Sequence, residues 1–226
     1  MSETPEYTIQ RATAKPAVDG SWDGPAWVGV PALAVAHFHP ASSGHRPVTH
    51  AKVVYDAQTL YATFRVDDQF VRATREDLNA RVCNDACVEF FFEPKPEAGY
   101  FNFEINCLGT LYASYVEDPT RTPEGLGKAI KLNNRQAGMV QVYHSVPEVV
   151  FPEREEPLTW TVEYSIPLGL LEEFVGAIGD PASQTWRGNF YKCAEDNSHP
   201  HWASWAPIGE KLNFHVPQFF APLRFA

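Results

Sequence analysis

Three glutamates stand at positions where their carboxyl groups could act on a common ligand. Glu89, Glu104 and Glu163 each occupy a polar position in a stretch where apolar and polar residues alternate. Two carboxyl groups on either side of a glycosidic bond carry out glycoside hydrolysis, and their separation sets the stereochemical outcome. Sequence does not give this separation. A glycoside hydrolase or lyase that uses Glu89 with Glu104 or Glu163 is therefore one hypothesis.

The same polar positions also carry amides. Asn102 and Asn106 share the parity of Glu104 in one stretch, so the three side chains are expected on one face of a strand. Sugar hydroxyls both donate and accept hydrogen bonds, and they suit amides and carboxylates. A polar floor for a sugar is one interpretation. The other is the solvated face of an antiparallel sheet.

The most distinctive segment runs from Asn189 to Pro207 and contains two tryptophans. Trp202 and Trp205 have opposite parity, so in a strand they face opposite ways. One indole is expected in the core, and the other is expected exposed or in a cleft, where its flat face could stack on a sugar ring. The alternative is that both belong to the core.

Other reactive groups give weaker patterns. Cys193, His199 and His201 fit no familiar zinc spacing, and Cys83 and Cys87 are separated by three residues. We expect no metal at these groups and no cofactor, and a structural calcium is not readable from sequence. The chain contains no G-x-S-x-G elbow and no glycine-rich phosphate loop.

Composition limits the partners of the 226-residue chain. A net charge of −10 without any Lys/Arg run argues against nucleic acid. No apolar run is long enough to cross a membrane. The first residues do not resemble a secretory signal, which predicts a cytoplasmic protein with reduced thiols if this N-terminus is native. A secreted protein after signal removal would look the same. The oligomeric state is unknown at this level.

The elements that must position these residues are short strands with period-two alternation. One helix is expected from about Pro167 to Phe174, followed by Gly176, and loops are expected over Asp118–Lys128 and Pro147–Pro157. The predicted fold is all-β: one domain, residues 1–226, forming an antiparallel two-sheet β-sandwich of immunoglobulin-like or jelly-roll type. The expected strands are Thr49–Tyr55, Leu60–Val66, Ala86–Phe92, Phe101–Cys107, Thr110–Val116, Met139–Val146, Leu158–Ile166 and Trp186–Cys193.

Six stretches in this order resemble the family 9 carbohydrate-binding modules, a branch of the DOMON-like β-sandwiches. They are AVDGSWDGPAW (17–27), VYDAQTLYATFRVDD (54–68), NDACVEFFFEP (84–94), YFNFEIN (100–106), WTVEYSIP (160–167) and FHVPQFF (214–220). The resemblance covers nearly the whole chain. It implies a non-catalytic, bacterial module of polysaccharide catabolism that binds a plant-type polysaccharide fragment or oligosaccharide in a slot between two tryptophans.

The resemblance also implies roles for particular residues. Glu89 matches the glutamate of the V-E-x-F strand, and Trp205 looks like the C-terminal stacking tryptophan. Glu104 falls where family members have a sugar-contacting arginine, and Cys83 stands where the second tryptophan is expected, so Trp205 would be a one-sided platform. The full set of expected carbohydrate-binding residues is Trp205, Trp202, Glu89, Glu104, Asn106, Asn189 and Tyr112.

A remote alternative follows from the DOMON-like resemblance, because some sandwiches of this kind hold haem. Haem needs axial ligands in a pocket. Lys192, Met139 or a histidine could supply one, and nothing in the sequence selects among them.

Overall fold

The computed structural model describes residues 4–226 and is mostly β-structure. Its helices are short: α1 (Asn134–Ala137), α2 (Leu168–Val175) and 3-10 turns at Val82–Asn84 and Pro217–Phe219. The strands are β1 (Tyr7–Arg11), β2 (Leu33–Ala34), β3 (His37–Phe38), β4 (Val48–Tyr55), β5 (Thr59–Asp68), β6 (Val71–Ala73), β7 (Cys87–Glu93), β8 (Tyr100–Asn106), β9 (Leu111–Thr122), β10 (Gly125–Lys131), β11 (Gln141–His144), β12 (Val150–Arg154), β13 (Leu158–Pro167), β14 (Thr185–Ala194), β15 (His201–Ser204) and β16 (Ala221–Phe225).

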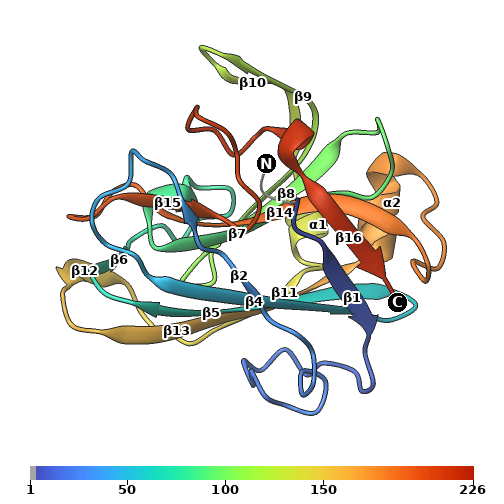
Figure 1. The fold of residues 1–226 in the computed structure, drawn as a ribbon, viewed down its shortest axis with the longest axis horizontal. Helices are drawn as coiled ribbons and strands as arrows, with labels where there is room; N and C mark the ends of the chain where they lie inside the picture. The colour runs from blue at the N-terminus through green and yellow to red at the C-terminus, as the bar shows by residue number, and fades with distance from the viewer. Residues whose placement is uncertain (1–3) are drawn as a thin grey trace.

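The strands form a sandwich-like arrangement. In Figure 1, β4, β5 and β13 lie in one layer and β7, β8 and β14 in the other. Hydrogen bonds run through the order β10-β9-β8-β7-β14-β16-β1-β4-β5-β13-β11. The prediction of a purely antiparallel arrangement is wrong at β1, which pairs in parallel with both β16 and β4. Parallel neighbours need a long connection between them, and both pairs have one: residues 12–47 join β1 to β4, and nearly the whole chain separates β1 from β16.

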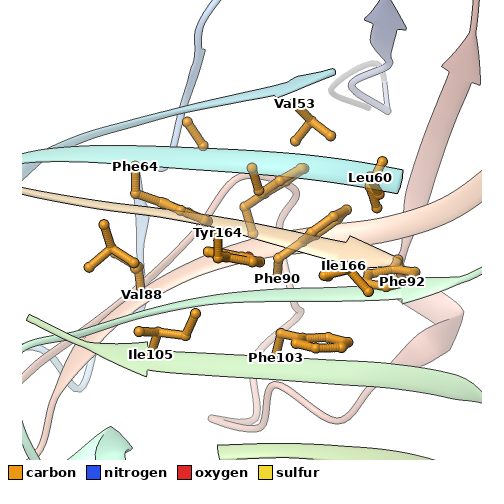
Figure 2. Packing of buried hydrophobic residues seen from close by; sticks show 14 of the residues in the cluster. Val53, Leu60, Phe64, Val88, Phe90, Phe92, Phe103, Ile105, Tyr164 and Ile166 are labelled. Atoms are coloured by element: carbon orange, nitrogen blue, oxygen red, sulfur yellow. The ribbon is translucent and has the colours of Figure 1, made fainter. Parts of the chain in front are cut away.

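Alternating residues of both layers fill the space between them. Phe90 of β7 stacks on Phe190 of β14 with ring centroids 4.3 Å apart. Phe64 of β5 and Tyr164 of β13 approach from the opposite layer, as Figure 2 shows. Burying each such side chain contributes about 1.5–3 kcal/mol. Because these residues point inward, their neighbours Cys87, Glu89 and Phe91 are turned to the outer face of β7.

Local signals locate the longer helix correctly but not every strand. As predicted, helix α2 follows Pro167 and stops before Gly176; it ends at Val175, and Gly176 has a positive φ of 69°. The predicted loop over 118–128 is instead part of the hairpin of β9 and β10. Strand β10 forms the edge of the sheet, where prolines are tolerated. The predicted loop over 147–157 contains β12, which pairs only with the short β6 among the described strands. None of the helices within residues 4–226 is long and apolar enough to cross a membrane.

Candidate functional site

The outer face of β7 and its neighbours carries side chains in rows that the strand register sets. One row crosses three strands from Trp202 on β15 through Cys193 on β14 to Cys87 on β7. In the next row Tyr191 of β14 is opposite Glu89, which is opposite Glu104 of β8, and this is opposite Tyr112 of β9. Residues directly opposite across a ladder share a face, so both rows lie on one surface.

A cleft of about 620 Å³ opens over these rows. Its floor includes Glu89, Glu104 and Cys193. Two segments rise around the floor: the tip of the β9–β10 hairpin, residues 121–125, and the loop 212–215. The other lining residues are Arg81, Cys83, Tyr112, Glu195 and Trp202. The polar face therefore forms the base of a cleft and is not a solvated outer surface.

The two glutamates of the floor are almost completely buried, at 2% exposure for Glu89 and 7% for Glu104. Glu89 accepts a hydrogen bond from the Cys193 thiol at 3.2 Å, and Glu104 accepts one from the Asn102 amide at 2.8 Å. Burial raises the pKa of Glu104 to about 7. Burial, and secondly the charge of Glu104, raises the pKa of Glu89 well above its usual value. A carboxyl group that holds its proton near neutral pH can donate as well as accept a hydrogen bond.

Asn102 precedes Glu104 by two residues on the same face of β8, and hydrogen bonds from β9 hold it in place. Its side-chain oxygen accepts hydrogen bonds from the backbone N–H and the hydroxyl of Ser114, at 3.0 and 2.5 Å. With its oxygen fixed in this way, the amide nitrogen is directed at Glu104. Asn102 therefore orients the carboxyl of Glu104 within the floor.

The two tryptophans face opposite ways, and the structure reverses their expected roles. Trp202 is half-buried at the cleft, and its indole N–H donates to Glu195 at 3.3 Å. Trp205 is only 7% exposed and packs edge-on against Tyr7 and Phe190 in the core. The expectation that Trp205 presents the stacking face is therefore corrected: Trp202 is the indole at the cleft. The parity of the two positions predicts that the indoles face opposite ways, but it does not predict which of them faces the core.

Tyr112 lines the cleft, where the Lys131 ammonium lies 5.0 Å from its ring.

Three other residues that we expected at the site use their side chains in structural hydrogen bonds instead. They are Asn106, Asn189 and Glu163. The Asn106 side chain accepts hydrogen bonds from the backbone N–H groups of Leu108 and Thr110 and so holds the turn after β8. Asn189 is hydrogen-bonded to both the backbone N–H and the carbonyl of Ala206. Glu163 lies on β13, in the other layer, and accepts hydrogen bonds from Gly20 and Trp27. Glu163 therefore cannot share a substrate with Glu89.

The histidines considered as metal ligands do not join Cys193. His199 stacks on Phe70 with ring centroids 3.7 Å apart. His201 lies 2.7 Å from the Lys192 ammonium, and Lys192 alternates with Cys193 and faces inward. Met139, considered for haem, packs against the core, and neither it nor Lys192 lines the cleft. The remote haem hypothesis gains no support from these positions.

Sequence reasoning missed the residues that form the walls of the cleft. Arg121, Asn213 and His215 come from a predicted loop and from a segment that carried no strand pattern. His215 is hydrogen-bonded to the Tyr100 hydroxyl at 2.7 Å, and burial, with Arg121 second, lowers its pKa to about 3. Only the resemblance of FHVPQFF to family modules marked this segment. Its position over the floor follows from tertiary packing.

Comparison with known proteins identifies the family. The model of carbohydrate-binding family 9 matches residues 29–225. The chain belongs to this family. A candidate carbohydrate-binding protein from Bacteroides uniformis is 26% identical, with a TM-score of 0.85 and coverage of 99% of this chain and 100% of that one. No curated protein matches the chain.

Two solved family 9 structures from Caldicellulosiruptor kristjanssonii share the fold. The complex with glucose is 13% identical, with a TM-score of 0.63 and coverage of 97% of this chain and 95% of that one. The complex with cellotriose is 12% identical, with a TM-score of 0.64 and coverage of 98% and 93%. This family 9 chain thus has the fold of sugar-binding modules, with Cys83 at the edge of its cleft.

Proposed function

We propose that the chain binds a neutral oligosaccharide, such as a plant polysaccharide fragment, in the cleft above β7 and β8. One observation carries this proposal. A half-buried indole, Trp202, and two buried carboxyl groups, Glu89 and Glu104, line the same cleft. An indole offers its face to the C–H side of a pyranose, and the carboxyls offer partners to the hydroxyls.

The charge of the lining favours a neutral sugar. Burial raises the pKa of Glu89 and Glu104, so these two carboxyls add little negative charge near neutral pH. The charges of Glu124 and Glu195 are balanced by those of Arg81 and Arg121. An anionic sugar would lose hydration in a lining without net positive charge, which costs free energy. Cys83 offers no second indole at this edge, so a sugar ring would stack on one side only. Relatives bound to glucose and cellotriose make these two sugars the first ligands to test.

Calorimetric titration with glucose, cellotriose and xylo-oligosaccharides tests the proposal. Trp202→Ala should weaken binding about tenfold or more, since a lost aromatic contact of about 1.5 kcal/mol corresponds to that factor. The matched control is Trp22→Ala, another half-buried tryptophan, whose ring lies under Lys52 outside the cleft. Equal effects of the two substitutions, or no binding of any neutral oligosaccharide at millimolar concentration, would refute the proposal.

A second candidate function is glycoside cleavage, favoured by the direct cross-strand pairing of Glu89 with Glu104. A carboxyl group whose pKa lies near 7 can act as a general acid at neutral pH. For this function, Glu104→Gln should abolish turnover of an oligosaccharide while its binding persists. If the unaltered protein releases no reducing ends from the sugars it binds, cleavage is excluded for those sugars.

A further inference from the structure

A compact set of sulfur and carboxylate groups lies in the floor of the cleft. The Sγ atoms of Cys87 and Cys193 and a carboxylate oxygen of Glu89 all lie within 4.8 Å of one another. Each of the three residues is at most 2% exposed. Cys87 and Cys193 are directly opposite across β7 and β14, and Glu89 follows Cys87 by two residues on the same face. The register of two strands therefore holds all three groups in place.

The cations around this set are directed elsewhere. Lys192 adjoins Cys193 in sequence, but its ammonium contacts His201 and Asp68 on the inner side of the layer. Within residues 4–226 neither Glu89 nor Glu104 forms an ion pair. Arg81 and Arg121 line the cleft, but Arg81 pairs with Glu195 and Arg121 donates to Asn213. Two buried carboxyls and two buried thiols thus share one region without an ion pair to a protein cation. Buried acidic groups of this kind are normally balanced by a cation or remain protonated.

We propose that Cys87, Cys193 and Glu89 bind one zinc ion at the base of the cleft. Thiolates select zinc and similar soft ions, whereas calcium and magnesium prefer ligand sets made of oxygen alone. Zinc with ligands at about 2.3 Å for sulfur needs the donor atoms about 3.8 Å or less apart in a tetrahedron. Cys193 Sγ and Glu89 Oε1 are already 3.2 Å apart. The other donor pairs lie within 4.8 Å, so they would have to close by at most about 1 Å when the ion binds.

Three protein ligands leave the fourth tetrahedral position open. Glu89 and Cys193 both line the cleft, so this position faces the cleft and can hold water or a hydroxyl group. The zinc site goes beyond sugar binding and does not depend on it, because metal binding is measured without any sugar. The spacing of the cysteines in the sequence predicts no such site, because the ligands come from two strands that are about a hundred residues apart in the sequence.

The test is a titration of reduced, chelator-treated protein with Zn²⁺ and, separately, with Co²⁺. One Zn²⁺ per chain should bind, with release of protons from both thiols and of any proton that the Glu89 carboxyl holds. Co²⁺ should give the near-ultraviolet charge-transfer absorption that marks thiolate coordination. Cys87→Ala and Cys193→Ala should each weaken Zn²⁺ binding at least about 100-fold and reduce this absorption. Glu89→Gln should weaken Zn²⁺ binding and retain the absorption.

The matched control is Cys107→Ala, which removes another buried thiol from the core outside this cluster. It should bind Zn²⁺ as the unaltered protein does. Absence of stoichiometric Zn²⁺ binding in the reduced, unaltered protein would overturn the proposal, as would a Co²⁺ complex without thiolate absorption. Both measurements use the unaltered chain, so they remain decisive even if a cysteine variant fails to fold.

Discussion

Replacement of Glu104 by glutamine should stabilise the protein, and the gain should grow with pH. A carboxyl whose pKa is higher in the folded than in the unfolded chain binds more protons when folded, so stability falls as the pH rises between the two pKa values. For Glu104 this interval runs from the usual 4.5 to about 7. It corresponds to about 3 kcal/mol of unfolding free energy above neutral pH. Glutamine keeps the acceptor for Asn102 and carries no charge.

Urea unfolding of metal-free protein at several pH values measures this effect. Glu104→Gln should raise the free energy of unfolding by about 3 kcal/mol near pH 8, by about 1.4 kcal/mol near pH 5.5 and hardly at all near pH 4. The control, Glu148→Gln, removes an exposed glutamate and should change stability by less than about 0.5 kcal/mol. A gain in unfolding free energy that does not vary with pH, or a loss near pH 8, would refute the conclusion that burial raises the pKa of Glu104.

Three further substitutions test the scaffold by urea or thermal unfolding. Lys192→Met leaves the buried carboxylate of Asp68 without its ammonium partner and should cost about 3–5 kcal/mol. Burial alone would raise the pKa of Asp68, but Lys192 and His45 outweigh it and hold this pKa well below its usual 3.8, so the loss should shrink as the pH falls below that value. Trp205→Ala should lower the free energy of unfolding by about 3–5 kcal/mol, because the indole is buried in the core. A loss below about 1 kcal/mol, as is typical of exposed positions, would show that Trp205 is not a core residue. Gly188→Ala places a Cβ 2.6 Å from the Phe91 carbonyl oxygen and should cost about 1–3 kcal/mol, whereas an unchanged melting temperature would show that β7 and β14 can separate.

Period-two alternation predicted the strands of the core and the orientation of their side chains. In β7 it separated Val88 and Phe90, which pack inward, from Glu89, which faces the cleft. This succeeds because one face of each strand must pack against the opposite layer, so parity is under direct physical constraint. Helix α2 was equally accessible, since its flanking Pro167 and Gly176 are local signals.

Alternation could not predict which strands become neighbours. Glu104 and Glu163 have the same pattern around them, yet one lies in the cleft floor and the other bonds Trp27 in the opposite layer. The choice between Trp202 and Trp205 failed for the same reason. The register and the order of strands in a sheet depend on pairing between segments that are far apart in the sequence, and no local pattern determines this pairing.

The parallel pairing of β1 with β16 has a mechanical consequence. Tyr7 to Ile9 lie beside Leu223 to Phe225 in register, and Arg11 donates its backbone N–H to Ala226. Tension between the two ends would pull β1 from its beginning and β16 from its end, in opposite directions along a shared ladder. All the hydrogen bonds of the ladder would then be loaded together in shear and would not peel apart one at a time. The terminal pair would act as a clamp against stretching.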